Sequence, residues 1–472
     1  MIALTLAEVA EAVSGRLAGG AAPDARVVGA VEYDSRKVAP GGLFVAFEGE
    51  RVDGHTYAAE AIRRGAAAVL ATRDVGVPAV IVADPLAAMG QLAREVSQRL
   101  DAAVVGVTGS SGKTSVKDLI GQLVSPLGPT VAPPGTLNNE LGHPYTVLKA
   151  DQATRCLVLE YSARGVGHIR HLCELTRPRI GVVLNVGGAH IGEFGSVENI
   201  AIAKGELVEA LPAADEGGVA VLNADDPRVA AMASRTAARV VTYGLSPDAE
   251  VRAADVQLDD RGRPRYRLIA PAGETDVQLG LTGAHQVGNS LAAATAALQC
   301  GLPFDALGEG LKQLRLVSER RMDVFDTDQG VTVIDDSYNA NPGSMAAALN
   351  ALASIGGRRR RWAVLGYMAE LGEHERAGHE EVGRLVAQLG VDRLVVVEDA
   401  AAPIAYGARG EPNWGGEAVQ VPDQETAVAV LRDGLASGDV VLVKGSRYRT
   451  WKVADALRAG LQRDDAVGEA RS

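Results

Sequence analysis

The chain begins with short apolar runs that glycine interrupts. Such runs occupy residues 42–47, 67–70 and 78–82, and each has the length of a β-strand. Between residues 86 and 100 the apolar positions recur at helical spacing, which predicts an amphipathic helix. We therefore expect residues 1–100 to form a small N-terminal α/β domain whose last helix leads into the rest of the chain.

From residue 101 onward, continuous apolar strands alternate with helical stretches. This alternation is typical of a parallel sheet that helices cover on both faces. The strands predicted before residue 317 are 102–107, 156–159, 180–184 and 219–222. The pattern then restarts, with strands predicted at 331–334, 362–365, 394–397 and 440–443. The fold class is thus α/β with three domains: 1–100, a central domain over 101–316 with a mostly parallel sheet, and a Rossmann-like C-terminal domain over 317–472.

Length and charge narrow the possible functions. The chain has 472 residues, which is enough for about three domains. Its formal net charge of −12 disfavours a chain-wide electrostatic grip on nucleic acid or anionic lipid. No apolar stretch is long enough for a membrane helix, and the first residues do not form a signal peptide, so we expect a cytoplasmic protein. The three cysteines form no CxxC pair and suggest neither a disulfide framework nor a thiolate zinc site.

The strongest local motif is a short phosphate-binding loop. It follows a predicted apolar strand and precedes a helical pattern over residues 116–124. Its residues are Thr108, Gly109, Ser110, Ser111, Gly112, Lys113 and Thr114. Backbone N–H groups of such a loop cradle phosphate oxygens, the lysine neutralises the distal phosphates, and the hydroxyl of Thr114 can bind magnesium. Val107 stands where the longer form of the motif has its first glycine, so this is a shortened variant that predicts ATP binding.

A carboxylate that could hold the magnesium ion follows the next predicted strand. Glu160 closes the run 157–159, and in a parallel sheet that end lies beside the phosphate loop. An acidic residue at a strand end is often only a surface residue or a helix cap, and the loop nearby is what favours a metal ligand.

Four further polar clusters lie at strand ends or helix starts. They are residues 135–144, His190 with Lys204 downstream, His285 with Asn289, and residues 335–345. Each has a plain structural alternative, namely a turn, a buried histidine, a solvated lysine or a helix cap. For His190, the position at the carboxyl end of a strand, where α/β proteins bind ligands, favours a functional role. For residues 335–345, the density of polar groups exceeds what one turn requires.

Taken in chain order, these segments resemble the Mur ligase family, whose members form amide bonds with ATP in bacterial peptidoglycan synthesis. The resemblance spans nearly the whole chain. It is carried by TGSSGKT, TLNNELGHP at 136–144, Glu160, the segment from His190 to Lys204, GAHQVGN at 283–289, Arg321, DDSYNANPGSM at 335–345, GYMAELGEHE at 366–375, VKGSR at 443–447, and DSRKVAPGGLFVAFEGERVDGH at 34–55. Tyr367 departs from the pattern, because an aspartate is usual there.

The resemblance implies a particular reaction. ATP phosphorylates the terminal carboxylate of UDP-N-acetylmuramoyl tripeptide, and the amine of D-alanyl-D-alanine attacks the acyl phosphate to give the pentapeptide precursor of peptidoglycan. Such an enzyme serves cell-wall biogenesis, cell shape and cell division. Its partners are then these two small substrates, and we expect a monomer that binds no nucleic acid.

The family likeness also implies roles for single residues. Thr114 and Glu160 hold one magnesium ion, and Glu160, His190 and a carbamylated Lys204 hold a second. Asn289, Arg321 and Asp336 contact the nucleotide. Lys113, Lys204, His190 and Arg321 form the implied catalytic set. The implied substrate-binding residues are Asp34, Ser35 and Arg36 in a UDP-sugar-binding N-terminal domain, Asn138 and Asn139 in the central domain, and Lys444, Ser446 and Arg447 in the C-terminal ligase domain.

Three alternatives remain open at this point. One is a sibling ligase that adds a single amino acid or glutamate, although no DNPR-type segment of the diaminopimelate- or lysine-adding members is present. A second is a P-loop phosphotransferase, which would leave a stable phosphorylated substrate. The third is a nucleotide-gated binding protein without chemistry.

Overall fold

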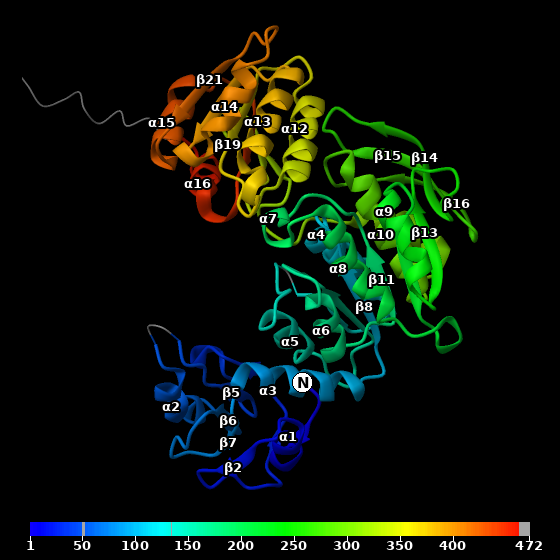
Figure 1. Cartoon of the computed structure of the whole chain (residues 1–472), viewed down its shortest axis with the longest axis vertical. Coiled ribbons are helices and arrows are strands. Elements are labelled where there is room, and N and C mark those ends of the chain that lie inside the picture. The colour runs from blue at the N-terminus through cyan, green and yellow to red at the C-terminus, as the bar shows by residue number, and fades with distance from the viewer. Residues whose placement is uncertain (50–51, 134, 462–472) are drawn as a thin grey trace, which may run out of the picture.

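The computed structural model describes residues 1–49, 52–133 and 135–461, and it contains three α/β units in chain order (Figure 1). The N-terminal unit, blue, and the C-terminal unit, yellow to red, lie at opposite ends of the molecule. The central unit, cyan to green, lies between them. In the described part of the chain, no helix is both long and apolar enough to span a bilayer.

The N-terminal unit is built on a five-stranded sheet. Its strand order is β2-β7-β6-β5-β4, in which only the β2–β7 pair is antiparallel. The sheet strands are β2 (Arg16–Ala18), β4 (Val31–Glu32), β5 (Leu43–Val45), β6 (Ala68–Ala71) and β7 (Ala79–Ile81), and β1 (Leu4–Thr5) pairs separately with β3 (Arg26–Val27). The helices are α1 (Leu6–Ala12), α2 (Ala58–Arg63) and α3 (Pro85–Gln98).

Helix α3 confirms the amphipathic helix predicted over 86–100. It begins after Asp84, whose side chain accepts hydrogen bonds from two N–H groups of the first turn, and Pro85 occupies the first helical position. The face carrying Met89, Leu92 and Val96 is fully buried. The same apolar core continues under the central unit, so α3 joins the two units by packing.

The central unit holds a nine-stranded sheet in the order β16-β15-β14-β13-β12-β11-β8-β10-β9. Its strands are β8 (Ala103–Thr108), β9 (Thr130–Val131), β10 (Cys156–Glu160), β11 (Ile180–Val183), β12 (Val219–Asn223), β13 (Arg239–Gly244), β14 (Val251–Leu258), β15 (Pro264–Ala270) and β16 (Gly273–Gln278). The four strands predicted from the sequence are confirmed. In the spatial order of the sheet, all strands from β14 to β9, β8 included, are parallel to their neighbours.

Helices cover both faces of this sheet, as the continuous apolar strands predict. Helices α4 (Lys113–Val124) and α10 (His285–Gln299) bury one face against Val105, Val107 and Val158. Helix α8 (Val197–Glu209) packs on the opposite face. The remaining helices of the unit are α5 (Gly142–Val147), α6 (His168–Leu175), α7 (Ile191–Phe194), α9 (Pro227–Ala230) and α11 (Leu307–Gln313).

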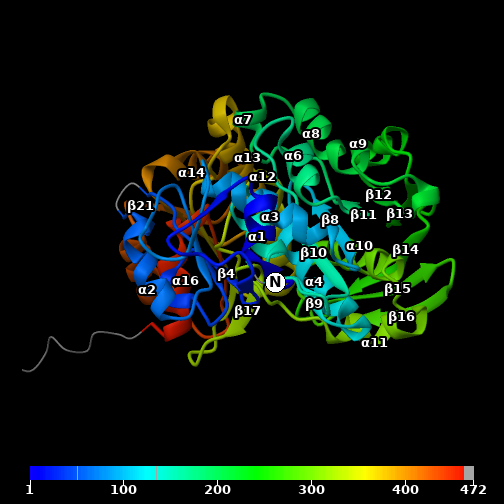
Figure 2. The same cartoon turned by 90° about the horizontal axis from the view of Figure 1, so that it is seen from below.

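The last three strands of the central sheet were not expected from the sequence. Strand β15 pairs antiparallel with both β14 and β16, so a meander extends the parallel sheet. Figure 2 shows this extension at one side of the molecule. Alternate residues of β15 are buried and exposed, which is the pattern of a sheet with one solvated face.

The C-terminal unit has a six-stranded sheet in the order β17-β18-β22-β19-β20-β21. Its strands are β17 (Asp323–Asp326), β18 (Thr332–Asp335), β19 (Arg361–Leu365), β20 (Arg393–Val397), β21 (Glu417–Val421) and β22 (Val440–Lys444). Only β17 is antiparallel to its neighbour. Helices α12 (Pro342–Gly356), α13 (Glu375–Gln388) and α14 (Ala402–Arg409) cover one face, and α15 (Gln424–Gly434) and α16 (Trp451–Ala459) cover the other. The domain limits 1–100, 101–316 and 317–472 stay a proposal.

Candidate functional site

A large polar cavity lies between the central and C-terminal units. Its volume is about 880 Å³, and its walls come from both units. The central unit contributes Ser110–Thr114, Glu160 and Asn289, and the C-terminal unit contributes Asp336 and Arg447. A cavity of this size can hold a nucleotide together with a second substrate.

The phosphate-binding loop forms one wall of this cavity. Gly112 has φ +83°, a left-handed conformation that favours glycine, and it leads into the first residue of α4. A Cβ atom at Gly112 would also stand 2.9 Å from Oδ1 of Asn289, so the backbone conformation and this contact both favour glycine. The backbone N–H of Ser111 donates to Oδ1 of Asn185 at 2.9 Å, and the Lys113 ammonium donates to the carbonyl of Gly109 at 2.8 Å. The loop is therefore held in shape before any phosphate binds.

Two lysines of the central unit, Lys113 in the phosphate loop and Lys204 in α8, have pKa values that burial lowers. Burial lowers the pKa of Lys113, which the Glu160 carboxylate partly offsets. Burial also lowers the pKa of Lys204 well below its ordinary value, and Lys113 lowers it further. Among the described residues, no carboxylate lies within ion-pair distance of Lys204. An uncompensated, buried amine of this kind is reactive and favours an anionic partner.

Glu160 lies where the sequence predicted it. It ends β10 opposite Val107 of β8, the strand that leads into the phosphate loop. Asn138 Nδ2 donates to Oε2 of Glu160 at 3.2 Å, while the buried Oε1 has no hydrogen-bond partner. A buried carboxylate oxygen without a donor is a good ligand for a cation.

Arg321 reaches the phosphate loop from the segment that joins the two units. Its Nη2 donates to Oγ1 of Thr136 at 2.9 Å, and that hydroxyl lies 3.2 Å from Oγ1 of Thr114. The guanidinium also lies over the ring of Tyr338, 4.2 Å from its centroid. Arg321 is thereby fixed beside the hydroxyl that the sequence singled out for magnesium.

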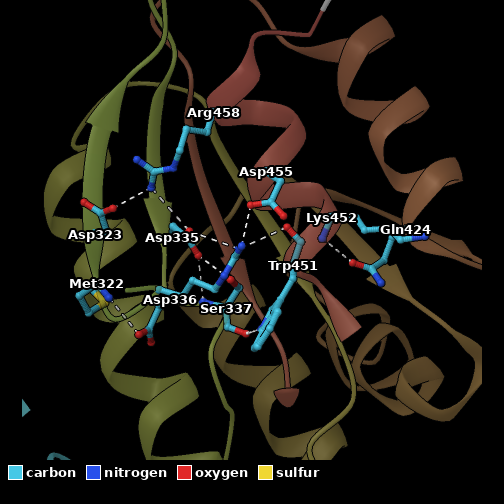
Figure 3. Close-up of polar contacts among 11 residues, drawn as sticks. Met322, Asp323, Asp335, Asp336, Ser337, Gln424, Trp451, Lys452, Asp455 and Arg458 are labelled. Atoms are coloured by element: carbon cyan, nitrogen blue, oxygen red, sulfur yellow. Dashed lines mark hydrogen bonds and ion pairs between the residues drawn. The ribbon is translucent and has the colours of Figure 1, made fainter. Parts of the chain in front are cut away.

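On the C-terminal side, Asp336 is held by two partners. The Lys444 ammonium lies 2.5 Å from Oδ2 of Asp336. The N–H of Met322 donates to Oδ1 of Asp336 at 3.0 Å (Figure 3). Lys444 also donates to the carbonyl of Asn339 at 2.9 Å and is nearly fully buried. Its charge is thus used to shape the loop that presents Asp336.

The neighbouring side chains of Figure 3 fix this loop to α16. Ser337 Oγ donates to Oδ1 of Asp335 at 2.6 Å, and the indole N–H of Trp451 donates to the carbonyl of Ser337 at 2.7 Å. Arg458 bridges Asp323 and Asp335 at 2.7 and 3.7 Å. Burial raises the pKa of Asp335. The loop after β18 is therefore anchored to α16, whose Trp451 also lines the cavity.

The structure brings most of the site residues predicted from the sequence together. Those that line the cavity are Ser110, Ser111, Gly112, Lys113, Thr114, Asn138, Asn139, Glu160, His190, His285, Asn289, Arg321, Asp336, Lys444 and Arg447. Three further predicted residues are not among those that line the cavity: Thr108 at the end of β8, Gly109 in the loop and Lys204 in α8. Ser446 accepts a hydrogen bond from the N–H of Ala369 at 3.0 Å and donates to Ala340 O at 3.2 Å, so it braces two loops.

Three predicted residues lie elsewhere, in the N-terminal unit. Asp34 caps a short 3-10 helix and accepts hydrogen bonds from the Arg36 side chain at 2.9 Å. Those contacts hold the pKa of Asp34 down at about 2. Ser35 is buried, and none of the three residues lines the cavity.

Several residues of the site were not predicted from the sequence. Asn185 positions the phosphate loop, Thr136 connects Arg321 with Thr114, and Glu370 contacts His190. Glu370 lies within GYMAELGEHE, which carried the family resemblance without a role for this residue. The signal available for Asn185 was its position just after an apolar strand, as for Glu160.

Comparison with known families covers most of the chain. The profile of the Mur ligase family catalytic domain matches residues 27–101, that of the Mur ligase middle domain matches 107–297, and that of the Mur ligase glutamate ligase domain matches 320–447.

Curated relatives align over nearly the full length. A protein named UDP-N-acetylmuramoyl-tripeptide--D-alanyl-D-alanine ligase from Mycobacterium tuberculosis is 49% identical, with 100% of both chains covered. The Escherichia coli protein of the same name is 37% identical over 95% of this chain and 96% of its own.

Solved structures are also similar to this chain over most of its length. MurF from Acinetobacter baumannii superposes with a TM-score of 0.85 at 29% identity, covering 97% of this chain and 99% of that one. MurF from Thermotoga maritima, solved with ADP, has a TM-score of 0.79 at 30% identity and covers 92% of this chain and 98% of its own.

Proposed function

The chain belongs to the Mur ligase family, and from this premise we propose how its cavity performs the ligation. The protein is an ATP-dependent ligase of peptidoglycan synthesis that adds D-alanyl-D-alanine to UDP-N-acetylmuramoyl tripeptide. One observation carries the proposal. The phosphate loop of one unit and the Asp336 and Arg447 loops of another line a single cavity, so ATP and a carboxylate substrate can meet there.

The reaction has two steps in which atoms are conserved. A carboxylate oxygen of the tripeptide attacks the γ-phosphorus of ATP, and ADP leaves. The amine nitrogen of D-alanyl-D-alanine then attacks the acyl carbon, phosphate leaves, and the amine gives up its extra proton. The first step brings two anions together, so fixed cations must offset their repulsion before in-line transfer.

The chain supplies those cations from two different segments. Lys113 lies in the phosphate loop, and Arg321 reaches the same region from the segment between the units. We assign phosphate neutralisation to Lys113 and stabilisation of the transferred phosphoryl group to Arg321. Asn289, next to Gly112, and Asp336 are assigned to nucleotide binding, and His285 lies beside them in the same cavity.

The residues present also fit magnesium. The candidate ligand atoms are Oε1 of Glu160, which has no hydrogen-bond partner, and the hydroxyl oxygen of Thr114. His190 and Lys204 lie nearby. As the likeness to the Mur ligases implies, we assign a second ion to Glu160, His190 and a carbamate on Lys204. Magnesium, when bound, would screen the phosphate charge and orient the γ-phosphoryl group.

Carbamylation of Lys204 is a testable part of this assignment. A neutral amine reacts with CO2 to give an N-carboxylate and a proton, and burial favours the neutral form of Lys204 by lowering its pKa. We expect 13C NMR of the protein in 13C-bicarbonate to show one carbamate signal that Lys204→Gln lacks. The matched control is Lys312→Gln on the exposed surface of α11. A wild-type signal that persists in Lys204→Gln, or no signal in the active complex, contradicts the assignment.

The substrate side of the proposal involves all three units. We assign the UDP end of the nucleotide sugar to Asp34, Ser35 and Arg36 in residues 1–100. Asn138 and Asn139 are assigned to the middle of the substrate, and the segment from Lys444 to Arg447 to the C-terminal ligase side. Lys444 and Ser446 act there by shaping loops, because their polar atoms are used within the fold. We further propose that the protein works in the cytoplasm as a monomer.

The decisive experiment measures phosphate release from MgATP with UDP-N-acetylmuramoyl tripeptide, with and without D-alanyl-D-alanine, followed by mass analysis of the product. We expect release to require both substrates and the product to be heavier by one dipeptide. Turnover with a single amino acid or glutamate instead would indicate a sibling ligase. A stable phosphorylated tripeptide would indicate a phosphotransferase.

A further inference from the structure

The central and C-terminal units touch at a tight joint beside the cavity. Helix α7 of the central unit packs on the 3-10 helix η7 (Gly372–His374) of the C-terminal unit, and Figure 1 shows α7 directly against that unit. A Cβ atom on Gly192 would stand 2.5 Å from the backbone N of Gly372. The N–H of Gly192 also donates to the carbonyl of Glu370 at 3.1 Å. The two backbones therefore approach as closely as glycine allows.

The residues on either side of this joint have unusual backbone conformations. His190 has φ +59° and Glu370 has φ +66°, although neither is glycine. Such left-handed residues cost on the order of 1 kcal/mol each, so surrounding contacts must impose them. Their shared effect is to place the imidazole of His190 against the carboxylate of Glu370, with Nδ1 in contact with Oε2.

The other carboxylate oxygen of Glu370, Oε1, contacts two arginines. Arg447 Nη2 donates to Oε1 at 2.9 Å, and Arg164 Nη2 lies 3.6 Å from the same atom. The carboxylate is thus held by an arginine from each unit while it contacts His190. It cannot turn away from the imidazole without losing these contacts.

An imidazole that gives Nδ1 to a carboxylate keeps Nε2 available as a lone-pair donor. Metal-binding histidines are commonly oriented in this way, and removing the outer carboxylate weakens metal binding by 10- to 100-fold. We propose that Glu370 is the positioning residue for His190 as a metal ligand, supplied across the joint by the C-terminal unit. The metal site is then complete only while the two units are docked. This inference rests on the proposed role of His190 as a ligand.

The test uses Mn2+ as the probe, because its free ion has an EPR signal. The full-length enzyme is titrated with Mn2+ in the presence of UDP-N-acetylmuramoyl tripeptide and a non-hydrolysable ATP analogue, so no turnover occurs. We expect Glu370→Gln to weaken the affected Mn2+ site by about 10-fold or more. Glu370→Asp should restore part of that loss. Glu373→Gln, an exposed glutamate of the same joint, should bind Mn2+ like the unchanged protein.

A second variant tests the joint without touching the carboxylate. Gly192→Ala places a methyl group against Gly372 and should weaken the same Mn2+ site while the melting temperature stays near that of the unchanged protein. In rate measurements, Glu370→Gln should lower kcat with little change in KM for UDP-N-acetylmuramoyl tripeptide, which a general loss of folding would not produce.

The His190→Ala variant distinguishes failure of the proposed ligand role of His190 from failure of the proposed positioning role of Glu370. If His190→Ala leaves Mn2+ binding unchanged, the ligand role of His190 in the proposed function is wrong. If His190→Ala weakens the Mn2+ site but Glu370→Gln binds Mn2+ like the unchanged protein, only the positioning role of Glu370 is overturned.

Discussion

Replacing Lys113 with alanine is expected to lower kcat/KM for ATP by about 10³-fold or more. The lysine is the cation that the phosphate loop itself supplies, and its Nζ is held at 2.8 Å from the Gly109 carbonyl at the cavity wall. Without it, the γ-phosphate and the attacking carboxylate repel one another. Initial rates of phosphate release measure the loss of turnover. Calorimetric titration with a non-hydrolysable ATP analogue measures the loss of nucleotide affinity.

The control for Lys113→Ala is Lys312→Ala, because Lys312 is exposed on α11 and lies 4.0 Å from Glu309. Its rates and nucleotide affinity should match those of the unchanged protein. The ligand-free Lys113→Ala protein should unfold at no lower temperature than the unchanged protein, since burial penalises the ammonium. Unaltered nucleotide affinity in Lys113→Ala would falsify the assignment of the loop to ATP.

Asp118→Ala is expected to destabilise the fold by about 3–5 kcal/mol. Lys117 Nζ and Asp118 Oδ1 lie 2.7 Å apart on α4, and each side chain is only 4% exposed. Ser318 Oγ donates to the other carboxylate oxygen at 2.5 Å. Removing Asp118 leaves the Lys117 ammonium buried without its counter-charge. Urea unfolding followed by circular dichroism measures the change.

A double variant distinguishes this cause from simple loss of packing. Lys117→Met combined with Asp118→Asn removes both charges, so it should cost clearly less than Asp118→Ala alone. Glu309→Ala breaks an exposed pair and should change the free energy of unfolding by less than about 0.5 kcal/mol. Equal losses in the double variant and in Asp118→Ala would contradict the explanation.

The sequence predicted those parts of the molecule that depend on neighbours in the chain. The phosphate loop is one, because an apolar strand, a glycine-rich turn and a helix start follow each other directly. Glu160 is another, because parallel strands end at the same edge of a sheet. Four strands of each large sheet were predicted for the same reason, because a continuous apolar run of this length is typical of a buried parallel strand.

Contacts between distant segments could not be predicted in this way. Ser318 bonds to Asp118 across 200 positions of sequence, and nothing local to either residue indicates the other. The contact between His190 and Glu370 depends on how two whole units dock. Lys444 and Ser446 follow a strand just as Glu160 does, yet the fold uses their polar atoms to hold loops together.

The sequence of the antiparallel meander does contain a local pattern that predicts a strand. Alternate residues of β15, such as Tyr266 and Leu268, are buried while Arg265 and Arg267 are exposed. That period of two differs from the continuous apolar runs used to recognise the parallel strands. A search for one strand pattern therefore missed the other.

The outer strands of the sheets bear on how the protein behaves at high concentration. A sheet edge with free N–H and C=O groups invites strand pairing with another chain, and such pairing leads to aggregation. Here β16 carries Glu274 and Asp276, β17 begins and ends with aspartate, and β21 begins with Glu417. At the other edge of the central sheet, β9 has only two residues. A second chain could add to these edges only by stripping water from carboxylates, so the sheets can stay open-edged in a crowded solution without joining one another.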